Sequence, residues 1–530
     1  MGYSSERNNG TRGNWKCILI CFAMSLANFQ TGYDGAAIGG FQAMVGFLKV
    51  YGFRDPKTRN GWNIATSTQQ LMTSFLSVGS IMGVLLTPAF GRRFGRRPAV
   101  WIACAVTFLA AALQLGTTTL AGLYIGRILL GLSNGFLVTF SNSYITESSP
   151  AHLRGSLVSF FGVWVTFGAL TASIIDNYTK EYKSKLCYQI PLALFYVVPT
   201  FLSIMLIFVP ESPRWLLVQN RPDEARKSLE RLRGNSLTPA LLEEEFLEMQ
   251  RGIGVERKLA QGRQFSDMFK GVDLRRTTLC LAACAAHAAS GIWFIISYGT
   301  FFFQVIGYKN PFLASIYTKL GSMIGAMIGI YICLKWMGRR PMIILGHVMG
   351  AFFMLALAVS SSVATNTEAV ATSAVACTVF FGFFYHGLSG ALGYALLNEI
   401  VSSRLRDTTI GFSWAITHVF IWLITFTTPY FINTNELNVG PKYGYVWAVS
   451  NTITAIWFFF FLPEVKGRTL EEIDELFQNR VSVRDFPTYE CISSTEARKA
   501  VTGESSEDYD ASRTYSLKEL NTPRVESFKV

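Results

Sequence analysis

Twelve apolar stretches of about 20 residues or more constrain the fold of this chain more than any other feature of its sequence. A helix needs about 20 mostly apolar residues to cross the roughly 30 Å hydrocarbon core of a bilayer. The sequence therefore predicts an all-α polytopic membrane protein with six spanning helices, a gap and six more. The stretches are 16–40, 66–90, 98–118, 121–143, 156–176, 188–209, 277–303, 311–334, 341–363, 371–397, 408–431 and 444–463.

The charge of the chain fits a membrane protein better than a nucleic-acid-binding protein. Apolar residues make up 50% of the sequence and charged residues only 15%, although the formal net charge is +12. The Lys and Arg residues lie in short segments between apolar stretches, as in cytoplasmic loops, and not on one basic face. We expect the lipid bilayer as a partner and no nucleic acid. The first apolar stretch contains Asp34 and exceeds a signal-peptide core, so it is interpreted as the first spanning helix.

The same pattern divides the chain into five regions. A cytoplasmic N-terminus (1–15) precedes a six-helix bundle (16–209), and a second six-helix bundle covers 277–463. Between the bundles, 210–276 is polar and charged and predicts a cytoplasmic insert of short amphipathic helices. Residues 464–530 form a cytoplasmic tail that is too poor in apolar residues to bury a core, and we expect disorder after about residue 477.

Basic residues near the helix ends predict the topology. Those on one side of the bundle are Arg92, Arg93, Arg96, Arg97, Arg154, Arg214, Lys335, Arg339, Arg340, Arg404 and Arg406. The positive-inside rule makes that side cytoplasmic, together with both termini. The sequon Asn177-Tyr178-Thr179 then falls outside, which predicts glycosylation at Asn177.

Two short motifs recur in the two halves of the chain. Gly95-Arg96-Arg97-Pro98 returns as Gly338-Arg339-Arg340-Pro341, and the Glu147 to Arg154 spacing of seven returns as Glu399 to Arg406. Two related six-helix halves are typical of alternating-access transporters, whose substrate site lies between the halves near the midplane. We expect these charges, with Arg404, to latch the halves on the cytoplasmic side. The alternative is that they only anchor the loops.

Asp34 is an acid deep within the first predicted helix. An unpaired carboxylate in hydrocarbon is costly, and such groups are usually functional. We expect it to pair with Arg127, just inside the fourth helix. A pair that breaks and re-forms during transport would let Asp34 take up and release protons. A permanent structural ion pair is the alternative interpretation.

The sequence indicates no metal, cofactor or enzyme chemistry. Cys280 and Cys284 are four residues apart, but no His or carboxylate nearby supplies further ligands. A constellation of nucleophile, base and oxyanion donors is also missing. The chain is therefore predicted not to be an enzyme.

Motifs along nearly the whole chain resemble the sugar porter branch of the major facilitator superfamily, in particular its fungal hexose-transporter-like members. They are Gly32-Tyr33-Asp34, Gly39-Gly40-Phe41-Gln42-Ala43-Met44, Glu147-x-x-Pro150-x-x-x-Arg154-Gly155, Pro210-Glu211-Ser212-Pro213-Arg214-Trp215-Leu216, Tyr298-Gly299-Thr300, Phe302-Phe303-Gln304 and Pro463-Glu464-Val465-Lys466-Gly467-Arg468-Thr469-Leu470-Glu471-Glu472. The resemblance implies a twelve-helix fold in the plasma membrane, transport of a small-molecule sugar and coupling to protons. It also adds Glu211, Arg214 and Glu464 to the predicted gate.

The positions at which this family holds sugar are largely replaced. By alignment of the motifs, Gly162, His287, Ala288, Trp293 and Ser322 stand where the family has amide side chains. In the tenth helix Tyr394 replaces a sugar-stacking Trp, and Ala391 replaces a Pro. Gly, Ala and Trp cannot make the paired hydrogen bonds of an amide. The resemblance therefore implies a pocket with fewer groups for sugar hydroxyls.

The remaining candidates for substrate binding are Gln30, Gln69, Gln70, Thr73, His287, Ser290, Trp293, Tyr298, Lys319, Ser322, Tyr394 and Trp414. Lys319 stands where the family has a neutral residue. If it faces the cavity, its charge favours an anionic substrate. If it instead reaches the outer interface, its role is to anchor the helix.

Three functions follow from these observations. The first is proton-coupled uptake of a monosaccharide by alternating access. The second is import or efflux of a non-sugar metabolite, aromatic or acidic, because the pocket is rich in aromatic groups and poor in amides. The third is a non-transporting receptor that signals sugar binding through its tail.

Overall fold

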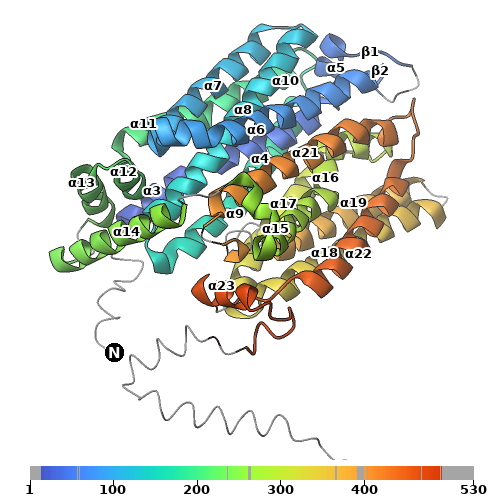
Figure 1. Cartoon of the computed structure of the whole chain (residues 1–530). Helices are drawn as coiled ribbons and strands as arrows, with labels where there is room; N and C mark the ends of the chain where they lie inside the picture. The colour runs from blue at the N-terminus through green and yellow to red at the C-terminus, as the bar shows by residue number, and fades with distance from the viewer. Residues whose placement is uncertain are drawn as a thin grey trace, which may run out of the picture. The chain divides into compact units, whose positions relative to one another are not determined.

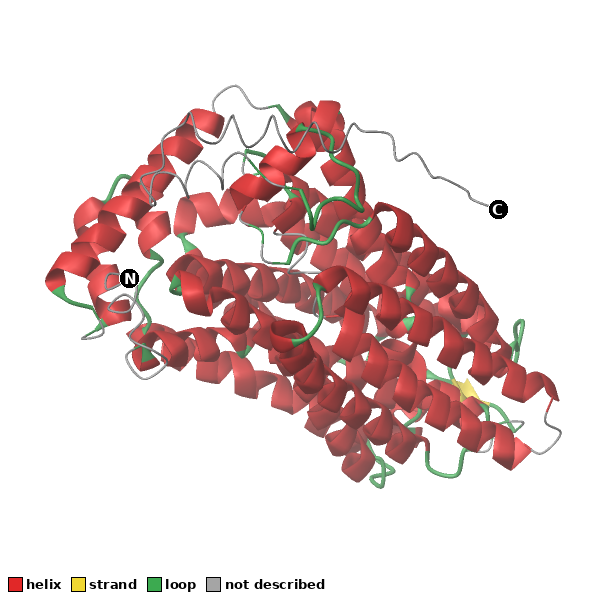
Figure 2. Ribbon diagram, turned by 90° about the horizontal axis from the view of Figure 1, so that it is seen from below, coloured by secondary structure: helices red, strands yellow, loops and turns green. Residues whose placement is uncertain are grey.

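The computed structural model describes most of the chain between residues 14 and 491. The chain divides into two compact units, Met1–Leu462 and Pro463–Val530, and the first contains the spanning helices. Nearly all described secondary structure is helical, with one short strand pair (Figure 2). The described residues are 14–56, 58, 60–234, 237–260, 264–363, 367–390, 399–402, 404–466, 468, 470–489 and 491.

The first half of the bundle contains six spanning segments. They are the pair α3 (Trp15–Ser25) and α4 (Ala27–Phe41), then α6 (Thr66–Phe94), α7 (Arg96–Gly116), α8 (Leu120–Ser148), α9 (Ala151–Thr179), and the run of α10 (Leu186–Ala193), η1 (Leu194–Tyr196) and α11 (Val197–Phe208). The loop after α4 holds α5 (Val45–Tyr51) and the antiparallel strands β1 (Phe53–Arg54) and β2 (Trp62–Asn63).

The second half also contains six spanning segments. They are the pair α15 (Gly271–Ala289) and α16 (Ile292–Val305), then α17 (Pro311–Lys335), α18 (Arg339–Val363), α19 (Thr367–Phe384) continued by the π-helix η3 (Tyr385–Gly390), α21 (Arg406–Ile432), and α22 (Gly444–Phe461) after the short η4 (Gly440–Tyr443).

These segments confirm the predicted twelve-helix fold. Among the described residues, eleven helices or runs of helix are long and apolar enough to span a membrane. The first predicted span falls short of that length because the helix breaks at Leu26, whose N–H bonds to the carbonyl of Ala23. The amide of Asn28 donates to the carbonyl of Ser25 (3.0 Å), which satisfies a carbonyl at the break. Together α3 and α4 cover the predicted stretch.

Close glycine contacts join corresponding helix pairs in the two halves. A Cβ at Gly83 of α6 would lie 3.1 Å from the Cα of Gly135 in α8, and one at Gly329 of α17 would lie 1.8 Å from the carbonyl oxygen of Gly387 in η3. Small residues let helix backbones approach each other in membranes. The second and fourth segments therefore pack as the eighth and tenth do, as expected of the predicted repeat.

The seventh segment is broken between α15 and α16. Gly291 adopts a left-handed conformation (φ +88°), and a side chain there would meet the ring of Trp447. Glycine occupies this conformation without the clash that other residues suffer. The carbonyl of Ser290, next to the break, accepts a hydrogen bond from the amide of Asn451 (2.8 Å).

The two halves meet along two long helix pairs, α6 with α21 and α9 with α17 (Figure 1). In addition, α4 of the first half packs against α16 of the second. In line with the predicted topology, we call the end of the bundle with Thr66 and Asn433 the outer end. The end with Arg96 and Arg339 is called the inner end.

Short helices occupy the predicted insert between the halves. They are α12 (Pro213–Val218), α13 (Pro222–Arg233), α14 (Pro239–Ala260) and the 3₁₀ helix η2 (Phe265–Phe269). Trp215, Leu229 and Phe246 pack together on their apolar faces. Arg233 binds Glu245 of α14 (2.6 Å) and the carbonyl of Ser148 (2.9 Å), which ties the insert to α8.

The second unit contains α23 (Leu470–Gln478) and a folded extension after it. The guanidinium of Arg468 donates to the carbonyls of Phe486 (3.0 Å) and Tyr489 (2.7 Å), and Phe486 packs on Phe477. Ordered contacts therefore continue past residue 477, where the sequence predicts disorder. Residues 492–530 lie outside the described part.

Candidate functional site

The predicted pair of Asp34 and Arg127 forms in the core of the first half. Asp34 of α4 is 0% exposed and Arg127 of α8 is 1% exposed, and Nη1 of Arg127 bonds to Oδ1 of Asp34. Nδ2 of Asn134 donates to the second carboxylate oxygen (3.3 Å), and Nε of Arg127 donates to the carbonyl of Met72 in α6 (3.1 Å). Three helices are thus joined around one buried charge pair.

The hydrogen bonds of this pair leave one group unsatisfied. Nη2 of Arg127 is buried and has no hydrogen-bond partner. Removing one member of a buried pair leaves an uncompensated charge, which typically costs about 3–5 kcal/mol. Asp34 and Arg127 therefore have to change protonation or partners together.

Amide side chains surround the first-half part of the predicted substrate site. Nε2 of Gln69 donates to Oε1 of Gln42 (2.6 Å), and the hydroxyl of Thr73 donates to the carbonyl of Gln69 (3.0 Å). The amide nitrogens of Gln30 and Gln70 are buried without a hydrogen-bond partner. Buried amides with unused donors suit ligand hydroxyl groups. The family motif contains Gln42, but the sequence analysis did not select it for the site.

The second-half candidates lie around the break in the seventh segment. Nδ1 of His287 is 2.6 Å from the hydroxyl of Tyr385, and the hydroxyl of Ser290 donates to the carbonyl of His287 (2.9 Å). The indole nitrogen of Trp293 is buried without a partner. The hydroxyl of Tyr298 donates to the carbonyl of Thr425 (2.6 Å), so it is already engaged.

A small cavity opens beside His287 in this half. Of the predicted residues, His287 and Trp414 line it, whereas Ser290, Trp293, Tyr298, Lys319 and Ser322 do not. Tyr394 lies outside the described residues. The lining comprises Ala283, Cys284, His287, Ile343, His347, Tyr385, Ser389, Gly390, Trp414, Thr417 and Phe458.

Lys319 points into the protein and not toward the outer interface. Its side chain is 6% exposed, and Nζ donates to the carbonyl of Ile295 in α16 (3.3 Å). The interpretation that Lys319 only reaches the interface therefore does not hold in this structure. Ser322, one turn further along α17, donates to the carbonyl of Thr318 (3.0 Å).

Three hydrogen bonds join the two halves at the outer end. Nε2 of Gln42 donates to the carbonyl of Ser297 (3.2 Å), and Nδ2 of Asn433 donates to the hydroxyl of Thr66 (3.0 Å). Nζ of Lys180 donates to Oδ1 of Asn310 (2.9 Å). Polar contacts therefore close the outer end in this structure.

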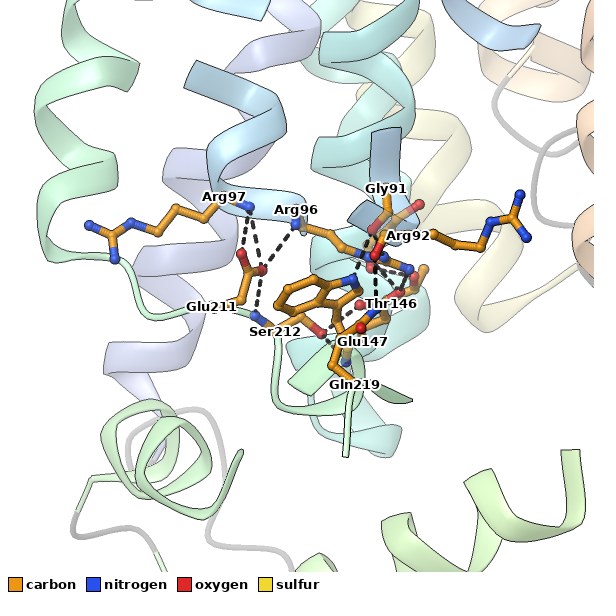
Figure 3. Close-up of polar contacts among 11 residues, drawn as sticks. Gly91, Arg92, Arg96, Arg97, Thr146, Glu147, Glu211, Ser212 and Gln219 are labelled. Carbon is orange, nitrogen blue, oxygen red and sulfur yellow. Dashed lines mark hydrogen bonds and ion pairs between the residues drawn. The ribbon is translucent and has the colours of Figure 1, made fainter. Parts of the chain in front are cut away.

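At the inner end, the predicted gate charges of the first half form a compact network (Figure 3). The guanidinium of Arg96 donates twice to Glu147 (2.7 and 3.1 Å). The carboxylate of Glu211 accepts the backbone N–H groups of Arg96 (3.1 Å), Arg97 (3.2 Å) and Ser212 (2.8 Å). A carboxylate at the start of α7 satisfies N–H groups that lack a partner within the helix. Burial nevertheless raises the pKa of Glu211.

The second half repeats the central ion pair of this network. Arg339 binds Glu399 (2.6 Å), as Arg96 binds Glu147. Arg340 donates to the carbonyl of Phe459 (2.6 Å).

The structure also describes three of the other predicted gate residues. Arg404 binds Asp267 of η2 (2.7 Å), and Arg214 lies in the first turn of α12. Glu464 belongs to the second unit, where it accepts the backbone N–H of Lys466 (2.9 Å). The side chains of Arg154 and Arg406 lie outside the described part. The ion pairs at Arg96 and Arg339 stay within their own half, so a latch between the halves stays a prediction.

The predicted glycosylation site lies in the last turn of α9. Oδ1 of Asn177 accepts a hydrogen bond from Lys180 (2.9 Å), and Thr179 is buried. The side chain of Asn177 is thus engaged in this structure, and its glycosylation stays a prediction.

The comparisons with known proteins agree with this architecture. Residues 20–477 match the family described as "Sugar (and other) transporter". The chain is 28% identical to the major facilitator-type transporter ecdD of Aspergillus rugulosus, over 92% of each chain. It is 27% identical to the high-affinity fructose transporter ght6 of Schizosaccharomyces pombe, over 89% of each chain.

A sensor and a solved symporter are also similar. The chain is 29% identical to the high glucose sensor RGT2 of Saccharomyces cerevisiae, over 88% of this chain and 61% of the sensor. The solved proton:xylose symporter XylE bound to 6-bromo-6-deoxy-D-glucose superposes with a TM-score of 0.72 and 23% identity, covering 88% of this chain and 100% of that chain. The chain therefore belongs to the sugar porter family of the major facilitator superfamily, and is a multi-pass membrane transporter and not an enzyme.

Proposed function

We propose that this transporter takes up a monosaccharide together with protons by alternating access. The observation that carries the proposal is the buried pair of Asp34 and Arg127 in the first half. A buried carboxylate that exchanges its cation for a proton couples proton movement to a change of conformation. The amide nitrogens of Gln30 and Gln70, which are buried in the same half without partners, supply donors for sugar hydroxyls.

Uptake of radiolabelled glucose, fructose and xylose tests this proposal. The host is a cell that lacks its own hexose carriers, the full chain is confirmed at the cell surface, and the external pH is acidic or neutral. We expect saturable uptake that increases at acidic pH. Asp34→Asn should abolish accumulation against a gradient but keep exchange of sugar across the membrane. Uptake that does not depend on pH would contradict proton coupling.

The second candidate function is transport of an acidic or aromatic metabolite. It is favoured by the cavity beside His287, which is lined by His347, Tyr385 and Trp414 but by no carboxylate among the described residues. Lys319 of α17, buried in the same half, adds a cationic group. Histidine and tyrosine donors with a nearby ammonium suit a carboxylate or an acidic phenol.

Competition separates the two candidates. Under the first proposal, an excess of unlabelled hexose blocks uptake of labelled hexose and benzoate does not. Under the second, labelled hexose is not taken up and labelled benzoate is. A surface-expressed protein that transports neither but still changes conformation with glucose would favour a receptor, in line with its similarity to the sensor RGT2.

A further inference from the structure

A second buried acid lies in the first half, away from Asp34. Asp176 of α9 is 1% exposed, and neither of its carboxylate oxygens has a hydrogen-bond partner. Asp34, in contrast, is bonded to both Arg127 and Asn134. An ionised carboxylate without a partner in an apolar interior is strongly unfavourable. Asp176 is therefore a neutral carboxylic acid in this structure.

The packing around Asp176 leaves room for the carboxyl group, and none of the described Lys, Arg or His side chains bonds to it. A Cβ at Gly40 of α4 would lie 2.1 Å from Oδ2 of Asp176, so glycine at this position makes the space. The titratable groups close enough to interact with it are Tyr33 of α4 and Cys187 of α10. The hydroxyl of Tyr33 donates to the carbonyl of Pro191 (3.0 Å) and is therefore already engaged. The nearest cation on its own helix is Lys180, which is bonded elsewhere.

Lys180 follows Asp176 by four residues and is held by the other half of the bundle. Its Nζ donates to Asn177 (2.9 Å) and to Asn310 (2.9 Å), and it lies 5.2 Å from the ring centre of Phe312. Asn310 and Phe312 belong to the start of α17. Residues four apart on a helix are neighbours and commonly form ion pairs. In this structure Lys180 binds the second half instead of Asp176.

We propose that Asp176 is a second proton-binding site of this transporter, which takes up a proton as the outer ends of the two halves close. When the outer ends separate, Asn310 and Phe312 move away from Lys180, and its ammonium pairs with the ionised carboxylate of Asp176. When the ends close, Lys180 again contacts Asn310 and Phe312 at the start of α17. The carboxylate of Asp176 is then shielded from water and separated from Lys180. As the ends close, it binds a proton from the outer water and becomes the neutral acid described above.

This inference rests on the alternating access of the proposed function, but not on the identity of its substrate. Proton binding favours the closed outer end because only that state removes Lys180 from Asp176. By linkage, each unit fall in pH can increase the ratio of closed to open protein by at most about tenfold for one proton.

Infrared spectroscopy of the purified full-length protein tests whether Asp176 is neutral. The carbonyl band of a protonated carboxylic acid should be present at neutral pH and absent in Asp176→Asn. The band should persist in Asp34→Asn and in Asp223→Asn, an exposed acid of α13 that serves as the control. A band unchanged by Asp176→Asn would overturn the proposal.

A distance measurement tests the coupling to closure, with spin labels at Ser184→Cys and Glu436→Cys. Both residues are exposed, and the partly exposed Cys333 and Cys377 are replaced by Ser. Acidification should increase the population with the short distance. In the Asp34→Asn background acidification should still increase this population, Asp176→Asn should remove the increase, and Lys180→Met should reduce it. If acidification acts equally with and without Asp176, the proposal is wrong. Neither measurement uses a substrate, so a failed hexose assay leaves both valid.

Discussion

Arg96 and Glu147 are joined by the same kind of ion pair as Arg339 and Glu399, at corresponding places in the two halves of the bundle. Each Arg begins the third segment of its half, and Glu147 lies in the last turn of the fourth segment. We expect Glu147→Gln and Glu399→Gln each to lower the stability by about 1 kcal/mol, because each removes a partly buried charged hydrogen bond. Thermal unfolding in detergent measures the effect.

The double variant Glu147→Gln with Glu399→Gln tests whether the two ion pairs act independently. The two pairs share no partners in the described contacts, so their effects on melting temperature should add. A loss in the double variant much smaller than the sum would show that the two pairs act as one unit.

Breaking the buried pair of Asp34 and Arg127 should cost more than removing it altogether. Asp34→Asn or Arg127→Gln alone leaves an uncompensated buried charge, with an expected loss of about 3–5 kcal/mol. The double variant Asp34→Asn with Arg127→Gln removes both charges and should recover most of that stability without recovering accumulation. Equal melting temperatures for the single and double variants would argue against this account.

The contact of Gly40 with Asp176 predicts a steric effect. Gly40→Ala should destabilise the protein by about 1–3 kcal/mol, because the new methyl group meets the carboxyl oxygen in a packed interface. Asp176→Ser shortens the side chain and should relieve much of this loss when combined with Gly40→Ala. Asp176→Asn, which keeps the size, should not relieve it. The melting temperatures of Gly40→Ala and of the two double variants show whether the size or the charge of residue 176 causes the loss.

The buried carboxyl of Glu211 predicts a pH dependence of stability. Burial raises its pKa above the ordinary value, so the folded protein binds this proton more tightly than the unfolded chain does. Its contribution to stability is therefore present at low pH and is lost as the pH rises through the folded pKa. Glu211→Gln should flatten the fall in melting temperature across that range, whereas Asp223→Asn should leave it unchanged.

Lys319 offers a test of substrate charge. Lys319→Met removes the ammonium that donates to Ile295 and fills a similar volume. For a neutral hexose, we expect the KM to change by less than about threefold, because a neutral sugar carries no charge that could pair with the ammonium of Lys319. If an acid is the substrate, Lys319→Met should raise its KM by tenfold or more and Lys319→Arg should not.

The sequence predicts the spans and the main ion pair for clear physical reasons. Apolar length alone identifies a membrane helix, and a buried charge needs a partner of opposite sign, which made Arg127 the candidate for Asp34. The repeated Gly-Arg-Arg motifs likewise indicated two similar halves. These features depend on residues close in sequence or on a simple balance of charge.

Other parts of the site depend on tertiary packing that no local pattern reveals. Tyr385 and His347 line one cavity with His287, where a π-helix interrupts the α-helix of the tenth segment and the seventh segment is broken at Gly291. Asp176 lies near the end of an apolar stretch, where a polar residue usually marks the interface. Only the fold shows that α4 buries it.

The break at Gly291 also has a mechanical consequence. On the outer side of the break, α16 packs against α4 of the first half as well as against α17 and α21 of its own half. On the inner side, α15 packs against α21 and α22 of its own half. A continuous helix would transmit any tilt along its whole length, whereas two pieces joined at a glycine can tilt by different amounts. The outer piece of the seventh segment can thus adjust its tilt against the first half during a transport cycle while the inner piece keeps its packing within the second half.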